Sequence, residues 1–236
     1  REMVAHARRA LAAAPELREI EASLARIATR ATSRRRAERR LGRRVDENVR
    51  DLRLVAFGEA ARGLDRVTRD LAVTLRKEIV LAVEDRELEL DRAVVEALRD
   101  PLLHLVRNAA DHGIEDPDVR AAAGKPRQGH IRVIPTTSGA WVEVRVEDDG
   151  GGVPTAAVRE ALLSAGRAAL DLDEDALVQA VVEPGITTAR ALTSISGRGV
   201  GLDAVRASLR GLGGTLHIAS RPGEGTCVTL GVPAAV

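Results

Sequence analysis

The sequence predicts an α+β fold, a two-layer α/β sandwich preceded by an antiparallel two-helix hairpin. Two observations predict it. Residues 1–55 show only helical periodicity, whereas from residue 56 onward helical patterns are mixed with short stretches of alternating apolar and polar residues. A mixture of strands and helices along one chain suits a layer of helices packed on a sheet. We therefore expect two parts, a helical hairpin at 1–55 and a sandwich domain at 56–236.

The amino-terminal part contains two narrow apolar stripes separated by a break at 29–36. They are formed by Leu17, Ile20, Leu24 and Ile27, then by Leu41, Val45, Val49, Leu52 and Val55. A hairpin of this length can hardly bury both stripes alone, so pairing with a second copy into a four-helix bundle is the expected solution. The alternative, a hairpin folded back on its own sandwich domain, stays open.

The second part contains, in order, the elements of the sandwich. Helical spacing predicts helices, and alternation or short β-rich runs predict strands. The expected order is a helix at 60–75, a strand at 78–84, a helix from about Asp91, strands at 130–136 and 141–146, helices at 154–165 and 174–182, a helix from Leu202, and strands at 215–220 and 226–232.

Composition limits the possible functions. The chain has 236 residues, 44% of them apolar, which is enough for a substantial core and one small extra domain. A formal net charge of +1 gives no basis for nucleic-acid binding. One arginine cluster, without interleaved aromatics, is interpreted as a solvated face: Arg34, Arg35, Arg36, Arg39, Arg40, Arg43 and Arg44.

The expected location is the cytoplasm. Cys227 is the single cysteine, so the chain forms no disulfide within itself, and this suits a reducing compartment. No apolar run approaches the roughly 18 residues that span a membrane, and no signal peptide is recognised. Because the sequence opens at Arg1, we expect it to be a fragment of a longer protein.

The segment from His104 to Glu115 places polar groups on a helix face that would otherwise be core. His104, Asn108 and Asp111 follow at i, i+4 and i+7 and share one stripe, which predicts that this stripe faces something polar. The competing interpretation, a solvated Asn108 and a satisfied core His104, is equally good for the helix taken alone.

Glycine-rich segments after this helix favour a nucleotide site. Asp148 opens a D-x-G-x-G pattern with Gly150 and Gly152, directly after a predicted strand. A carboxylate can accept a hydrogen bond from an exocyclic amine such as that of adenine, and glycines let a flat base lie on the backbone. Taken alone, a glycine-rich turn explains the segment better.

Two further glycine segments follow. Gly197, Gly199 and Gly201 lead into the helix from Leu202, where free N–H groups and the helix dipole attract phosphate. A lone G-x-G-x-G is weak evidence, but the preceding stretch is no strand, which argues against a dinucleotide fingerprint. The segment 223–226 is expected to be a plain hairpin turn.

The order of these motifs resembles the ATP-binding fold shared by sensor histidine kinases, DNA gyrase, Hsp90 and MutL. Within that superfamily the details resemble the CheA chemotaxis kinases. The resemblance runs from about Leu52 to Val232 and is carried by the segments 100–115, 120–126, 183–189 and 196–203.

The resemblance implies a role for each matching residue. Asn108 would ligate Mg²⁺, Asp148 would hold adenine, and the glycines of the second loop would frame the phosphates of ATP. Arg107 and His112 would lie near the phosphates. A salt bridge or a cation at the helix C-terminus is the alternative role for both, and it is nearly as good for Arg107. The remaining residues implied to contact the nucleotide are Asp111, His112, Gly150, Gly152, Val200 and Thr226.

His104 discriminates between reactions within the superfamily. The ATP-driven clamps carry Glu four residues before the Asn, where it suits a general base for water. This chain has His there, as the CheA-type kinases do. The resemblance therefore implies phosphoryl transfer to a protein histidine, with His104 and Arg107 as catalytic residues and positioning as the main requirement.

Two departures from the family pattern bear on activity. Val182 and Ile186 stand in the lid segment where phenylalanines are usual, and we interpret this as compositional drift, because aromatics make up only 1% of the chain. His6 is followed by Ala-Arg-Arg and is a poor phosphoacceptor. The resemblance implies a separate phosphotransfer domain that supplies the histidine in trans.

The implied partners are a second copy through the amino-terminal helices, a histidine-bearing phosphotransfer domain, and a response regulator and receptor-coupling protein that act through parts outside this sequence. A catalytically weak nucleotide-binding scaffold and an ATP-hydrolysing clamp remain alternatives. The sequence does not identify the input signal, the response regulator or the pathway.

Overall fold

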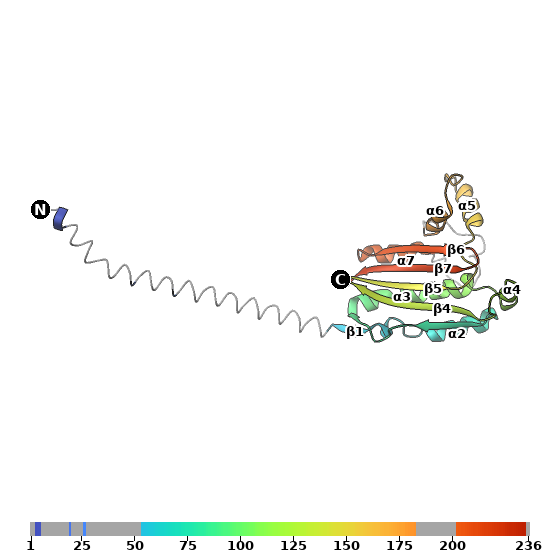
Figure 1. The fold of residues 1–236 in the computed structure, drawn as a ribbon, viewed down its shortest axis with the longest axis horizontal. Coiled ribbons are helices and arrows are strands. Elements are labelled where there is room, and N and C mark those ends of the chain that lie inside the picture. The colour runs from blue at the N-terminus through green and yellow to red at the C-terminus, as the bar shows by residue number, and fades with distance from the viewer. Residues whose placement is uncertain (1–2, 6–18, 20–25, 27–52, 183–201, 235–236) are drawn as a thin grey trace. The chain divides into compact units, whose positions relative to one another are not determined.

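The computed structural model describes residues 3–5, 19, 26, 53–182 and 202–234 (Figure 1). The chain divides into two units, Arg1–Leu52 and Arg53–Val236. In the first unit the described residues are helical. The predicted break at 29–36 and nearly all of the predicted hairpin lie outside the described residues, so the hairpin and its dimer remain predictions.

The second unit is built on a five-stranded mixed sheet with strand order β2-β4-β5-β7-β6 (Figure 1). β2 and β4 are parallel, and every other neighbouring pair is antiparallel. The strands are β2 (Ile79–Val83), β4 (Gly129–Ser138), β5 (Trp141–Asp148), β6 (Thr215–Arg221) and β7 (Gly225–Pro233). All five were predicted from the sequence.

One face of the sheet carries the core. Along β5 the residues Val142, Val144 and Val146 are buried, while their neighbours Glu143 and Arg145 are exposed. This alternation arises because successive side chains of a strand point to opposite faces. The sheet therefore has one apolar face for helices and one polar face for solvent.

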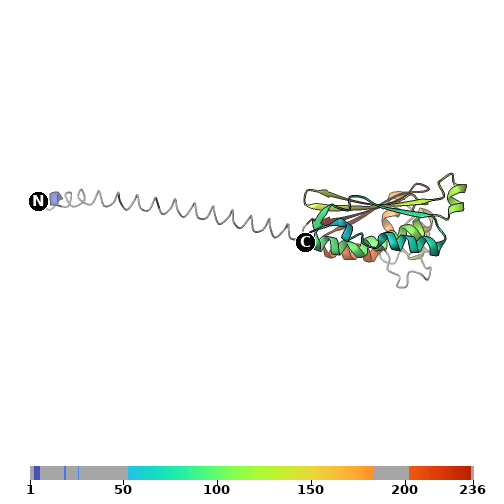
Figure 2. The same ribbon diagram turned by 90° about the horizontal axis from the view of Figure 1, so that it is seen from below.

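Helices α2 (Leu64–Leu75), α3 (Arg92–Asn108) and α7 (Leu202–Gly211) form the second layer, on one side of the sheet (Figure 2). α3 touches both α2 and α7 as well as strands β5 and β7. Its buried residues, among them Leu98, Leu102 and Leu105, belong to the main core cluster together with the inward residues of the strands. The predicted two-layer α+β fold is confirmed.

Two more helices, α5 (Thr155–Ser164) and α6 (Glu174–Ala180), pack on each other at one end of the sheet. They share a small second core, formed by Val158, Leu162, Ala169, Leu177 and Ala180. Both helices were predicted. A short helix that was not predicted, α4 (Pro117–Ala122), precedes β4.

The sequence analysis was wrong about the residues around Val55. They form strand β1 (Leu54–Ala56), which pairs antiparallel with β3 (Glu89–Asp91), instead of the last turn of a helix. Three-residue strands carry too little periodicity to be distinguished from a helical stripe. The 3-10 turn η1 (Phe57–Glu59) then buries Phe57 completely.

Helix α2 begins at Leu64, four residues later than predicted. The residue before it, Gly63, has a φ of 88°, a left-handed conformation that a helix cannot include. Helix α3 begins as predicted, because Asp91 caps it: its Oδ1 accepts a hydrogen bond of 2.9 Å from the N–H of Ala93.

Candidate functional site

The helix that carries Asn108 changes its winding immediately after this residue. α3 ends at Asn108, and η2 (Ala109–Gly113) is a π turn in which the N–H of Ile114 donates to the carbonyl of Ala109 at 2.8 Å. The sequence analysis extended one α-helical stripe through Asp111, and the wider turn corrects that geometry. π turns often occur at functional sites.

Lys77 holds this π turn in place. Its Nζ donates to the carbonyl oxygens of Asp111 at 2.6 Å, Ile114 at 2.7 Å and Ala110 at 3.0 Å. Burial lowers the pKa of Lys77, although the charges of Asp111, Asp116 and Glu115 oppose that effect. The sequence analysis missed Lys77, since a lysine directly before a strand has no distinctive pattern.

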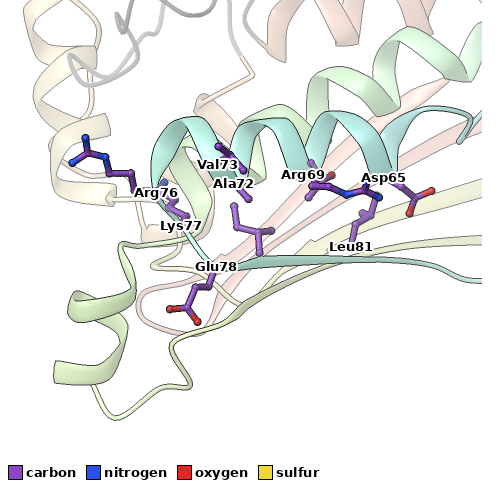
Figure 3. Close-up of a pocket in the computed structure, with 10 residues that line it drawn as sticks. Asp65, Arg69, Ala72, Val73, Arg76, Lys77, Glu78 and Leu81 are labelled. Carbon is purple, nitrogen blue, oxygen red and sulfur yellow. The ribbon is translucent and has the colours of Figure 1, made fainter.

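Lys77 also lies at the end of a groove of about 480 Å³ between α2 and β2 (Figure 3). The groove has apolar walls and a rim of mixed charge. It contains none of the residues predicted to hold nucleotide or metal. Its lining is Asp65, Thr68, Arg69, Ala72, Val73, Arg76, Lys77, Glu78, Ile79 and Leu81.

The predicted residues on the helix end differ in exposure. His104 and Asn108 are half-buried, whereas Arg107 and His112 are exposed. Nε2 of His112 lies 3.6 Å from Oδ2 of Asp111, so these two side chains meet at the surface of the π turn. The apolar neighbours Leu105 and Val106 are buried, as the helical pattern predicted.

Asp148 at the end of β5 lies directly against this helix end. A Cβ added at Gly113, the last residue of η2, would stand 3.0 Å from the Asp148 carboxyl group. The carboxylate accepts a hydrogen bond of 3.0 Å from the N–H of Gly150. The structure thus brings together the Asn-bearing helix and the D-x-G-x-G loop, which the sequence separates by some forty residues.

Burial raises the pKa of Asp148 to about 6, the N–H groups of Gly150 and Thr226 lower it, and the charges of Asp149 and Glu115 raise it further. Asp148 is half-buried, and a carboxylate with a strongly shifted pKa is typical of functional sites. No cation of the described residues pairs with Asp148.

The two glycines of the D-x-G-x-G pattern are required by the fold itself. A Cβ at Gly150 would stand 2.0 Å from the carbonyl oxygen of Gly113, and one at Gly152 (φ 75°) would stand 2.4 Å from that of Arg221. The sequence analysis explained these glycines by a base lying on the backbone, but the space that a side chain would take is filled by the protein's own main chain. Contact with a base remains a prediction for them.

The β6–β7 turn closes over the same loop. Thr226 pairs with Asp148 across β7 and β5, and the N–H of Gly223 donates to the carbonyl of Gly151 at 2.9 Å. Oγ of Ser220 lies 3.2 Å from Oγ1 of Thr226 and accepts from the N–H of Val153 at 2.8 Å. The plain hairpin expected at 223–226 is confirmed, and Thr226 lies beside the predicted adenine residue.

An ion network built around the buried Arg120 supports the loop from the other side. Arg120 is 0% exposed and bonds to Glu115 and Asp149, and Lys125 bonds to Glu115 as well. The sequence analysis quoted both cations only as parts of a motif and gave them no role. Arg120 and Lys125 are five residues apart and separated by a turn, a spacing that does not by itself indicate a shared ion network.

The second glycine loop lies outside the described residues. The roles predicted for Gly197, Gly199, Val200 and Gly201 therefore remain predictions, and Ile186 of the lid also falls there. Val182 is described and is 4% exposed within the main core cluster. An aliphatic side chain at position 182 is thus well buried.

In the part of the chain that the structure describes, no helix is long and apolar enough to cross a membrane. Within the same residues, no group of three or more His, Cys, Asp and Glu side chains gathers as a metal site. Cys227 lies on β7 as predicted and is a free thiol, whose pKa is raised by burial.

Comparison with known proteins adds to this geometry. Residues 93–236 match the family described as histidine kinase-, DNA gyrase B- and HSP90-like ATPases. The chain is 40% identical over 199 residues to the chemotaxis protein CheA of Treponema pallidum, which covers 82% of this chain and 24% of the relative. It is 35% identical over 195 residues to the gliding motility regulatory protein of Myxococcus xanthus, covering 80% and 25%.

Among solved structures, the catalytic domain of histidine kinase ThkA superposes with a TM-score of 0.47 at 17% identity, over 77% of this chain and 95% of that one. The chain spans about a quarter of the length of the two curated relatives named above. The family match covers the Asn-bearing helix, the D-x-G-x-G loop and the β6–β7 turn that meet in the structure. The chain therefore belongs to the family of histidine kinase-, DNA gyrase B- and HSP90-like ATPases, with CheA proteins among its relatives.

Proposed function

We propose that this chain binds ATP with Mg²⁺ and transfers the γ-phosphoryl group to a histidine on a separate phosphotransfer domain. The observation that carries the proposal is the close approach of the end of the Asn108 helix to Asp148, a half-buried carboxylate with free acceptor capacity. An ATP-binding domain of the histidine kinase type needs an acceptor for the adenine amine beside a metal ligand for the phosphates.

The donor set fits Mg²⁺. Asn108 offers an amide oxygen, a hard ligand, at the last residue of α3. Mg²⁺ usually takes one or two protein ligands and completes its shell with phosphate oxygens and water. One amide oxygen agrees with this coordination. Among the described residues, no cluster of carboxylates is preassembled at the site. When bound, the ion would neutralise charge on the phosphates.

His104 supports transfer to protein over hydrolysis. It lies one helical turn before Asn108 on α3 and is half-buried. A neutral imidazole can assist a histidine nucleophile and is a poorer base for water than the Glu of the ATP-driven clamps. Arg107, which adjoins Asn108 in sequence and is exposed, would meet the charge of the phosphates.

The partners follow from the same proposal. The acceptor histidine comes from a phosphotransfer domain, and the chain works as a homodimer through residues 1–55, in the cytoplasm, with a response regulator and a receptor-coupling protein reached through other parts of the protein. The curated relatives that are named chemotaxis protein CheA support this assignment. The pathway need not be motility.

Calorimetric titration of ATP and Mg²⁺ tests the site. The unaltered chain is expected to bind, and Asn108→Asp and Asp148→Ala are each expected to lose binding while circular dichroism shows intact folding. Binding that survives both substitutions would place the nucleotide elsewhere. No binding by the folded, unaltered chain would contradict the kinase function.

Transfer is tested separately with γ-labelled ATP and a supplied histidine phosphotransfer domain. Label on that domain, lost with His104→Ala, supports the proposal. Label that never leaves ATP, despite binding, would indicate a nucleotide-binding scaffold. Steady release of phosphate that depends on His104 would indicate an ATP-hydrolysing clamp.

A further inference from the structure

Arg120 connects the three segments that meet behind the D-x-G-x-G loop. Its Nη1 donates to Glu115 Oε2 and to the carbonyl of Asp149, both at 3.0 Å, and its Nη2 donates to Asp149 Oδ2 at 3.0 Å. Nε and Nη2 also donate to the carbonyls of Pro126 at 2.8 Å and Gln128 at 3.2 Å. With its side chain 0% exposed, this guanidinium is fully used in holding main chain and carboxylates.

Lys125 also links Glu115 to the Asp148 loop, at a position closer to solvent than Arg120. Its Nζ donates to Glu115 Oε1 at 2.9 Å and to the carbonyls of Asp149 at 2.9 Å and Gly150 at 2.8 Å. Its side chain is 19% exposed, so the site is only partly open to solvent. Both cations therefore link the segment after η2 to the loop that begins at Asp148.

The main chain of the two segments is in direct contact at the same place. The N–H of Gly151 donates to the carbonyl of Gly113 at 3.0 Å. Because Gly150 already approaches Gly113 as closely as two backbones can, a small shift of Glu115 or Asp149 would move the loop against the helix end. The cations fix both sides of that contact.

The same cations balance the charge around Asp148. Burial raises the pKa values of Glu115 and Asp149, but hydrogen bonds outweigh it: Lys125 and Arg120 bond to Glu115, and the main-chain N–H of His130 with the side chains of Arg120 and His130 bond to Asp149. The net pKa of each is lowered, so both stay ionised. Cys227 on β7 also interacts electrostatically with Asp148.

We infer that Arg120 and Lys125 are positioning residues for nucleotide binding, which lock the Asp148 loop onto the end of the Asn108 helix and neutralise the two carboxylates beside Asp148. This inference rests on the proposed function, since Asp148 acts on the adenine amine there. Neither cation touches the nucleotide. Each acts through Asp148, Gly150 and Gly151.

Lys125→Met is the main test, because it leaves Arg120 to hold the fold, and Arg127→Met is the matched control. Arg127 is on the same segment, 52% exposed, and pairs only with exposed Glu78 and Asp118 among the described residues. Lys125→Arg serves as the conservative variant. Thermal unfolding of all four proteins verifies the fold.

The first readout needs no nucleotide. Amide hydrogen exchange at Gly150 and Gly151 is expected to accelerate about tenfold in Lys125→Met. The N–H of Gly151 bonds to the carbonyl of Gly113 and reports the contact between loop and helix end, and the N–H of Gly150 bonds to Asp148 and reports the order of the loop itself. Exchange in the core strands is expected to be unchanged, as it is throughout in Arg127→Met. Unchanged exchange at both glycines would overturn the inference even if ATP binding is normal.

The second readout is the affinity for ATP between pH 6 and pH 8. Asp148 accepts from the adenine amine more strongly when it is ionised. With the Glu115 charge less compensated, the pKa of Asp148 rises, so the acid limb of binding should move up by about half to one pH unit. The loss in Lys125→Met is then about two- to fivefold near pH 6 and less than about twofold near pH 8, with discrimination against GTP reduced. Lys125→Arg should restore the profile.

The outcomes separate the two claims. An equal loss at every pH, with unaltered GTP discrimination, would make Lys125 a merely structural residue and overturn the inference while leaving the proposed function intact. Absence of ATP binding by the unaltered chain would overturn both, whatever the exchange data show.

Discussion

Asp148 and Asp149 are consecutive residues whose pKa values are shifted in opposite directions. Asp149 is bonded to Arg120 and His130, and hydrogen bonds hold its pKa below the usual value despite burial. Among the described residues, Asp148 accepts from main-chain N–H groups and lies near the negative charges of Asp149 and Glu115, and burial is the main cause that raises its pKa to about 6. The difference teaches that the fold neutralises the carboxylates that support the loop and leaves the one at the predicted adenine position available for a ligand.

Removal of Arg120 should break the ion network that supports the loop, and it gives the largest expected loss in the free energy of unfolding. Arg120→Met leaves Glu115 and Asp149 partly buried with fewer cations, and breaking a buried ion pair costs about 3–5 kcal/mol. Denaturant unfolding followed by circular dichroism measures the loss. A loss below about 1 kcal/mol would show that solvent reaches the network and replaces its bonds.

Replacing Asp148 by the neutral Asn should raise the free energy of unfolding instead of lowering it, by an amount that depends on pH. Its folded pKa lies above the ordinary value of 3.8, so the folded state binds more protons and loses stability as pH rises from about 4 through 6. Asp148→Asn removes this cost. As pH rises, the free energy of unfolding of the variant is expected to increase relative to that of the unaltered chain, by up to about 3 kcal/mol near pH 7.

Unfolding free energies of the unaltered chain and of Asp148→Asn, measured from pH 4 to pH 7, check this prediction. The same variant should lose ATP binding, so stability and binding change in opposite directions. A stability difference that does not vary with pH would mean that Asp148 titrates near 3.8.

Lys77 extends the comparison to a half-buried cation that, among the described residues, donates to three main-chain carbonyls. Lys77→Met leaves the carbonyls of Ala110, Asp111 and Ile114 without this donor, and an unsatisfied buried acceptor costs about 1–3 kcal/mol. Because Met also removes the desolvation of the ammonium group, the loss should be smaller than for Arg120→Met. Equal losses of unfolding free energy in Lys77→Met and Arg120→Met would contradict the view that unpaired carboxylates cause the larger loss.

The smallest effect is expected from Arg127→Met. This side chain is paired with Glu78 at 3.2 Å and Asp118 at 2.7 Å, but all three groups are at least half exposed. Water replaces such bonds readily, so the unfolding midpoint should stay within the error of measurement, and added salt should not change that result. A clear loss of stability would show that exposed pairs of this segment also support the loop.

Sequence patterns were sufficient for the sheet and most helices of the second unit. Alternation along β5 and helical spacing along α3 are local properties, because burial on one face of a strand or helix dictates the period. Three-residue elements were missed: β1 was interpreted as helix because Val55 continued an apolar spacing. The family resemblance identified Asn108 and Asp148 from motif order alone, and their roles await the titrations above.

Other features depended on tertiary structure. The π turn after Asn108 is held by Lys77, which lies more than thirty residues away in sequence, and the glycine at 150 is required by the backbone of Gly113. Arg120 gains its role because folding brings Glu115 and Asp149 to either side of it. By itself the sequence determined which segments are strands and helices and which residue types carry the chemistry, because those depend on local spacing. Only the folded structure decided which charges are neutralised and which carboxylate stays available, because desolvation and ion pairing depend on neighbours from distant parts of the chain.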